Sequence, residues 1–119
     1  MSRAVLVLPI LTDMEESWRR FAQDLLEDHL GEYEALRRHL GIRHMRVYLA
    51  RMPRWDLILA YMEAEDPEEA FRRLVALENP YAGWLKDKIT ELHGCDVNRL
   101  RREFSPELIF VHPGEAGGP

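Results

Sequence analysis

The sequence predicts an α+β fold whose strands and helices follow the order β-α-β-β-α-β. Two short apolar runs, one near each end of the chain, have the length of buried strands. Between them, two segments of alternating character are joined by a Pro-containing turn, which is typical of a hairpin. Two stretches with apolar residues every three or four positions separate these strands. This order gives a four-stranded antiparallel sheet with helices on one face.

Size and composition indicate a single domain. The chain has 119 residues, of which 46% are hydrophobic and 31% charged. A chain of this length buries roughly two-thirds of its unfolded surface, which suffices for one core. We expect this domain to span residues 1–113, with a flexible tail at residues 114–119.

The first strand and the first helical stretch have recognisable boundaries. Ala4–Ile10 is the apolar run of the first strand, and Thr12–Glu15 has the spacing of a capping box. Apolar periodicity then continues to Leu40, with Gly31 as a possible kink or break. Gly41 follows, where a left-handed helix end is expected.

The hairpin lies within Arg43–Asp66. A turn centred between Pro53 and Arg54 sets residues of the two strands opposite each other and sorts them onto two faces. One face is apolar and suits burial under helices, with the pairs Met45–Met62, Val47–Ala60 and Leu49–Ile58. The other face has the pairs His44–Glu63, Arg46–Tyr61 and Tyr48–Leu59.

The second helical region has two starts. Asp66 followed by Pro67, and Asn79 followed by Pro80, each combine an N-cap residue with proline at the first helical position. The region should end at Gly94. The last strand is expected at Leu108–Val111.

The mixed face of the hairpin is the first candidate site. It carries polar and aromatic side chains beside leucines: His44, Arg46, Tyr48, Tyr61 and Glu63. One interpretation is that cross-strand polar pairs decorate a half-exposed sheet. The other is that this face lines a cavity or a subunit interface. In that case Glu63 would favour the protonated form of His44, and the two would form an acid/base pair.

A second candidate lies on the first helical stretch. His29 falls on the apolar stripe, one turn from Tyr33 and three residues from Glu32. It is either a core histidine with satisfied ring nitrogens or a catalytic or ligand-orienting group. Metal binding is the weakest interpretation, because His29 and Glu32 supply only two ligands. Trp84 and Tyr81, which follow Asn79-Pro80, could close one end of a pocket or belong to the core.

Composition and motifs exclude several classes of function. The net charge of −5 and the alternation of Arg with carboxylates argue against nucleic-acid binding. Phosphate-binding loops, hydrolase elbows and Cys-rich zinc motifs are absent. We therefore expect no metal or other cofactor. A single cysteine, Cys95, and the lack of a long apolar run predict a cytoplasmic protein without a membrane span.

The order of elements, over roughly residues 4–112, resembles the ferredoxin-like subunits of the dimeric α/β-barrel superfamily. Tyr61–Asp66, Asn79-Pro80 and Trp84 carry a likeness to small bacterial proteins of that superfamily. The superfamily includes cofactor-free antibiotic-biosynthesis-type monooxygenases, muconolactone-isomerase-like proteins and mutarotases. The resemblance implies a homodimer in which two open sheet faces meet. An uncovered apolar face, best covered by a twofold partner, favours the same assembly.

Two functions follow as hypotheses. The first is a small-molecule enzyme, a cofactor-free monooxygenase or isomerase for a polar or aromatic metabolite. His29 or His44 would then be the acid/base group, Arg46 would hold an anionic substituent, and a tyrosine (Tyr33, Tyr48 or Tyr61) would orient the ligand. The second is a non-catalytic homodimeric module that binds a ligand or serves a structural role.

Overall fold

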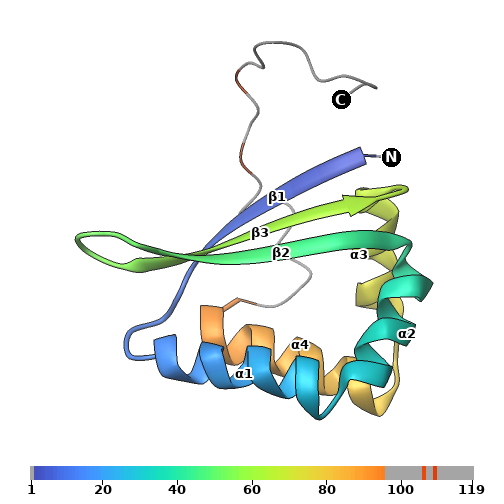
Figure 1. Cartoon of the computed structure of the whole chain (residues 1–119), viewed down its shortest axis with the longest axis horizontal. Coiled ribbons are helices and arrows are strands. Elements are labelled where there is room, and N and C mark those ends of the chain that lie inside the picture. The colour runs from blue at the N-terminus through green and yellow to red at the C-terminus, as the bar shows by residue number, and fades with distance from the viewer. Residues whose placement is uncertain (1, 96–105, 107–108, 110–119) are drawn as a thin grey trace.

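Four helices lie on one side of a three-stranded antiparallel sheet in the computed structural model, which describes residues 2–95, 106 and 109 (Figure 1). The strands follow the order β1-β3-β2 across the sheet. In chain order the elements are β1 (Ser2–Pro9), α1 (Glu15–Glu27), α2 (Leu30–Leu40), β2 (Ile42–Arg51), β3 (Asp56–Ala64), α3 (Pro67–Ala76) and α4 (Pro80–His93). The predicted α+β class is confirmed. The predicted last strand, Leu108–Val111, and the tail at 114–119 lie outside the described residues.

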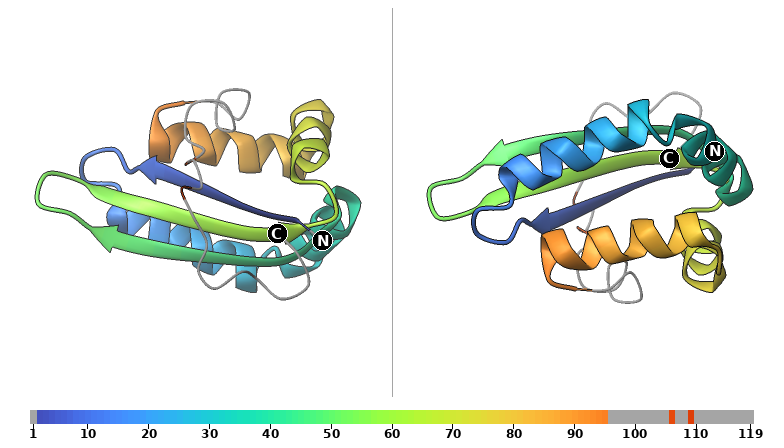
Figure 2. Two further views of the ribbon diagram at one scale, coloured as in Figure 1. Left: turned by 90° about the horizontal axis from the view of Figure 1, so that it is seen from above. Right: turned by 90° about the horizontal axis from the view of Figure 1, so that it is seen from below.

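The two longest helices run beneath opposite edges of the sheet. Figure 2 shows α1 along the β2 side and α4 along the β1 side, while α2 and α3 stand together at one end. Side chains from both layers form the core. The sheet contributes, among others, Ala4, Leu6, Leu8, Ile58 and Met62, and the helices contribute Leu36, Leu40, Ala70 and Leu74.

The hairpin has the predicted register. Met45 lies opposite Met62, Arg46 opposite Tyr61, and Tyr48 opposite Leu59. An irregularity between Ile42 and His44 leaves Arg43 outside the regular pairing. A bulge of this kind inserts one residue and reverses the alternation across it, so Ile42 is buried while His44 lies on the mixed face. From His44 to Arg51 the pairing is regular. The division of the sheet into an apolar and a mixed face is therefore confirmed, but Val47 of the apolar face lies on the edge strand β2 and is 44% exposed instead of buried.

The start of the first helix differs from the prediction. Instead of a capping box at Thr12–Glu15, α1 begins at Glu15 with Met14 as N-cap and no side-chain hydrogen bond to the helix end. Asp13 has a positive φ of 65°, and the Met14 amide donates to the Leu11 carbonyl. The chain thus turns between Leu11 and Met14, and this turn uses the residues that the capping box would need.

The first helical stretch is broken, two residues before Gly31. The amides of Asp28 and His29 both donate to the Asp24 carbonyl, which ends α1, and α2 begins at Leu30. The other predicted helix boundaries are confirmed. Asp66 accepts a hydrogen bond from the Glu69 amide and Asn79 from the Ala82 amide, while Gly41 and Gly94 have left-handed conformations with φ of 74°.

Candidate functional site

The mixed face of the sheet forms an open concavity of about 790 Å³. No described helix or strand covers it, because all four helices lie on the other side of the sheet (Figure 1). The concavity is lined by Val5, Arg43, His44, Arg46, Tyr48, Leu59, Tyr61 and Glu63. We call this set the open face. Five of the predicted site residues, His44, Arg46, Tyr48, Tyr61 and Glu63, are thus brought together.

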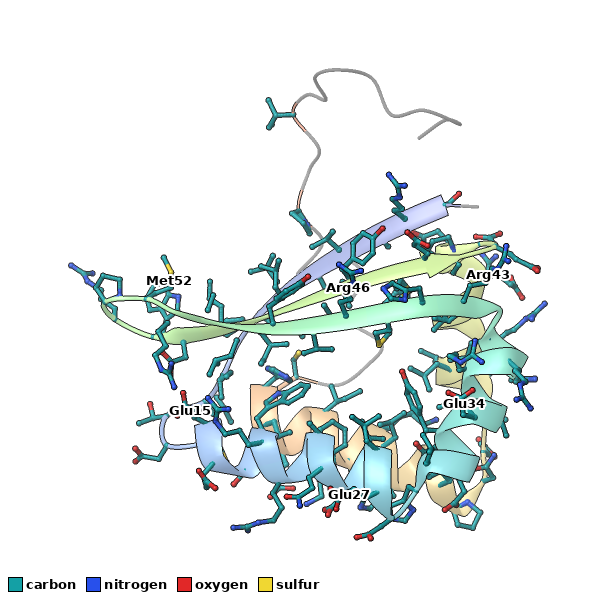
Figure 3. All side chains as sticks on the ribbon, viewed as in Figure 1. Glu15, Glu27, Glu34, Arg43, Arg46 and Met52 are labelled. Carbon is teal, nitrogen blue, oxygen red and sulfur yellow. The ribbon has the colours of Figure 1, made fainter. Side chains whose placement is uncertain are left out.

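Antiparallel pairing across three strands places these residues side by side. Val5 of β1 and Arg46 of β2 flank Tyr61 of β3, and each pair is in direct register. Arg43 joins the concavity from the irregularity at the start of β2. Figure 3 marks Arg43 near one end of β2 and Arg46 further along the strand. The sequence prediction missed Arg43 and Val5, since regular alternation does not reveal the bulge and β1 was not aligned to the hairpin.

Arg46 and His44 form one of two hydrogen-bonded pairs on this face. The Nε of Arg46 donates to Nε2 of His44 over 2.8 Å. A guanidinium can only donate, so Nε2 of His44 is the acceptor in this hydrogen bond. Hydrogen bonding to Tyr48 holds the pKa of the Arg46 guanidinium above its ordinary value.

Tyr61 and Glu63 form the other hydrogen-bonded pair. The Tyr61 hydroxyl donates to Oε1 of Glu63 over 2.6 Å, and Nε of Arg3 lies 3.7 Å from the same oxygen. The hydrogen bond from Tyr61 holds the pKa of the Glu63 carboxyl below its ordinary value, with Arg3 acting in the same sense. The same bond raises the pKa of Tyr61. These groups are accessible to solvent, so their pairing contributes little to stability.

The predicted acid/base pair on this face has a different geometry. His44 and Glu63 lie opposite each other in register, as the sequence predicts. However, Glu63 accepts its hydrogen bond from Tyr61, and His44 accepts from Arg46. The two side chains therefore belong to neighbouring hydrogen-bonded pairs.

The remaining predicted site residues lie on the other side of the sheet. Nδ1 of His29 lies 2.8 Å from Oε1 of Glu32, and the imidazole centroid is 4.6 Å from that of Trp84. The Tyr33 hydroxyl donates to the sulfur of Met45, on the apolar face of the hairpin. Burial raises the pKa of Tyr33. His29, Tyr33 and Trp84 therefore form a helix-side cluster separated from the open face by the sheet itself.

The helix-side cluster also contains Tyr81, the second aromatic residue that the sequence singles out after Asn79-Pro80. Tyr81 has its ring centroid 5.7 Å from that of Trp84 and 5.8 Å from that of His29. Its hydroxyl is buried and has no hydrogen-bond partner among the described residues. Burial, reinforced by the Glu32 carboxylate and Tyr33, raises the pKa of Tyr81 to about 12. This cluster packs aromatic rings against one another and is not part of the open concavity.

His93, at the end of α4, has a hydrogen-bond partner at each of its two ring nitrogens. Trp18 Nε1 donates to its Nε2 over 2.9 Å, and its Nδ1 lies 2.9 Å from the Pro9 carbonyl oxygen. A carbonyl can only accept, so Nδ1 carries the proton and the ring is neutral. Burial lowers the pKa of His93 below its ordinary value of 6.5. Its contacts join α4 to α1 and to the end of β1, which is a structural role.

The described residues form neither a metal site nor a membrane-spanning helix. Within residues 2–95, 106 and 109, no group of three or more His, Cys, Asp or Glu side chains is arranged to hold a metal ion. In the same part of the chain, no helix is both long enough and apolar enough to cross a bilayer.

No protein family model matches the chain, and no protein of curated function is similar to it in sequence. The resemblance to the dimeric α/β-barrel superfamily accordingly stays a prediction.

Proposed function

We propose that this protein binds a small anionic aromatic metabolite on the open face of its sheet, and that it acts as a homodimer. One observation carries the proposal. Two arginines, Arg43 and Arg46, and two tyrosines, Tyr48 and Tyr61, line the same concavity of about 790 Å³. Its volume lies within the range of roughly 300–1,000 Å³ that is typical of small-molecule sites.

The charges of the open face favour an anion. Arg43 and Arg46 are exposed, and no salt bridge joins either of them to a carboxylate of the described residues. The one acidic residue lining the concavity, Glu63, already interacts with Tyr61 and Arg3. Guanidinium groups bind carboxylates with charge-assisted, often bidentate hydrogen bonds.

The apolar part of the open face favours an aromatic body. Val5 and Leu59 lie between the polar groups, and the rings of Tyr48 and Tyr61 present flat surfaces beside them. Aromatic rings pack against one another in offset or edge-on arrangements and also stack on guanidinium planes. A planar ring carrying one carboxylate would use both halves of the face.

An open concavity leaves such a ligand partly in water. Tyr48 is 49% exposed, and no described element covers the sheet on this side. A second copy that presents the same face would enclose the ligand, because a twofold contact brings identical patches together. The homodimer is therefore part of this proposal.

A cofactor-free monooxygenase or isomerase is the second candidate, and the helix-side cluster favours it. Glu32 can only accept a hydrogen bond from Nδ1 of His29, and Nε2 of the same ring has no hydrogen-bond partner among the described residues. A carboxylate that orients an imidazole in this way is common in general bases. His44 fits this role less well because Arg46 occupies its acceptor nitrogen. Turnover of hydroxyaromatic substrates that is lost in His29→Gln and kept in Arg46→Gln would favour the enzyme.

The binding proposal can be tested with a titration followed by NMR. Benzoate, an aromatic carboxylate, should shift backbone amide signals of residues 43–48 and 59–63 in a saturable manner. Benzamide, which has the same shape without the charge, should bind more weakly. Arg46→Gln should weaken benzoate binding by about tenfold or more, the size expected for one charge-assisted contact.

A matched variant removes the same charge elsewhere. Arg54 is exposed in the turn between β2 and β3 and does not line the concavity, so Arg54→Gln should bind benzoate like the wild type. Equal losses in both variants would show that only net charge matters. Shifts that centre on α1 and α4 instead of the sheet would contradict the proposed site.

A further inference from the structure

Among the described residues, the open face carries more positive than negative charge. Arg43 and Arg46 line it, Arg3 lies beside it, and the only carboxylate among these groups belongs to Glu63. The chain as a whole has a net charge of −5, so this face is locally opposite in sign to the protein. Two copies that meet through this face bring two sets of guanidinium groups together. Like charges placed close together across an interface oppose association.

The same face also contains surface that favours association. Tyr48 is 49% exposed, and Leu59, Tyr61 and Val5 continue the apolar and aromatic surface across all three strands. Contiguous apolar surface of this kind is usually covered by a partner. Apolar contact thus draws two copies together while the excess positive charge of Arg43 and Arg46 holds them apart.

We infer that dimerisation through the open face is coupled to anion binding, so that the ligand is required for a stable dimer. This inference rests on the proposed function, because the anion is the ligand bound by Arg43 and Arg46. A carboxylate held on each face removes the excess positive charge at the centre of the contact. The partner copy then covers the ring of the ligand, which a single copy leaves exposed to water.

The coupling is reciprocal by thermodynamic necessity. If the ligand strengthens the dimer by some factor, dimerisation strengthens ligand binding by the same factor. Couplings between two binding events are commonly on the order of 5–150-fold. The apparent affinity for the ligand should therefore rise with protein concentration. A site that is independent of dimerisation would show no such dependence.

The coupling predicts an unusual behaviour for Arg46→Gln. This variant removes one repelling charge per copy and should dimerise more readily than the wild type without ligand. Its association should respond only weakly to benzoate, because the anion has lost a partner. Substitution of a residue that merely supports the interface would weaken the dimer both with and without benzoate. A variant that dimerises more readily without benzoate but responds weakly to it therefore identifies the coupling.

Sedimentation equilibrium of the full chain tests the inference, with benzoate, benzamide or neither present at constant ionic strength. We expect benzoate to lower the dimer dissociation constant of the wild type and of the matched control Arg54→Gln by about tenfold, within the usual range of such couplings. Benzamide should change the constant much less. Backbone amide shifts recorded on the same samples report benzoate binding separately.

The outcomes separate this inference from the proposed function. If benzoate shifts the open-face amides while the protein stays monomeric, or while a dimer of unchanged strength is present throughout, the coupling is wrong and the binding site stands. If benzoate leaves the amides of the open face unshifted, both fail. Species larger than a dimer would indicate a head-to-tail contact and would also overturn the coupling.

Discussion

The two faces of the sheet are built from the same strands, yet they serve different purposes. On β1, Ala4, Leu6 and Leu8 point toward the helices and are at most 7% exposed, whereas the alternate residues Arg3, Val5 and Val7 are not buried. The helix-facing side supplies most of the free energy of folding through apolar burial. The open face is under little packing constraint, so it can carry arginines, tyrosines and a carboxylate.

Two histidines show what this difference means for chemistry. On the helix side, His93 is 8% exposed, and both of its ring nitrogens have hydrogen-bond partners. On the open face, His44 is half-buried, and among the described residues its ring accepts a hydrogen bond from Arg46 at Nε2 and has no hydrogen-bond partner at Nδ1. The buried histidine is held in one tautomer by the core. The other retains a nitrogen that a ligand can reach.

Two adjacent residues of β3 test the difference between the two faces most directly. Ile58 is 3% exposed and faces the helices, while Leu59 faces the concavity. Ile58→Ala should lower the free energy of unfolding by about 2–5 kcal/mol, because it leaves a cavity in the core. Leu59→Ala should cost less than half as much. Urea unfolding of both variants at a low protein concentration gives the two values, and equal losses would show that the open face is packed like the core.

The next largest effect is expected at His93. His93→Ala removes the acceptor for Trp18 and the donor to the Pro9 carbonyl in a buried setting. Leaving those groups unpaired and a cavity behind should lower the free energy of unfolding by about 3 kcal/mol. His39→Ala is the matched control, since His39 is exposed at the end of α2. A loss no greater than that of the control would contradict the structural role of His93.

His93 also predicts how stability depends on pH. Its pKa in the folded protein lies below the ordinary value of 6.5, so the unfolded chain binds this proton more readily. The contribution is fully present above about pH 6.5 and is lost as the pH falls toward the folded pKa, with a slope of at most about 1.4 kcal/mol per pH unit. Urea unfolding measured at several pH values from about 8 to about 5 should show this slope in the wild type and a smaller slope in His93→Ala. Equal slopes would show that His93 does not titrate differently on folding.

The elements predicted best from the sequence are those whose residues act locally. Asp66 and Asn79 begin helices, Gly41 and Gly94 end them, and the alternation of the hairpin fixes its register because a slip of one residue would expose the core face. The division of the sheet into two faces, and five residues of the candidate site, follow from that register alone.

The features missed depend on contacts between distant segments or on local irregularity. His93 gains its role only when α4 brings it to Trp18 and Pro9, and neither is near it in sequence. Arg43 enters the open face through a bulge that no hydrophobic pattern reveals. His29, Tyr33 and Trp84 fall on apolar helical stripes, so periodicity could not tell which side of the sheet they would reach.

The smallest effect is expected for a single hydroxyl on the open face. Tyr61→Phe removes the donor that holds the pKa of the Glu63 carboxyl below its ordinary value. That pKa should rise toward the ordinary value of 4.5, but only in part because Arg3 still lies nearby. The urea midpoint at pH 7 should stay unchanged, since solvent reaches both groups. A carbon-13 NMR titration of the Glu63 carboxyl measures the shift, with Tyr48→Phe as the control that leaves Glu63 its donor. If the pKa of Glu63 stays the same while stability drops, the hydroxyl supports the fold, and the open face is less independent of the core than its exposure suggests.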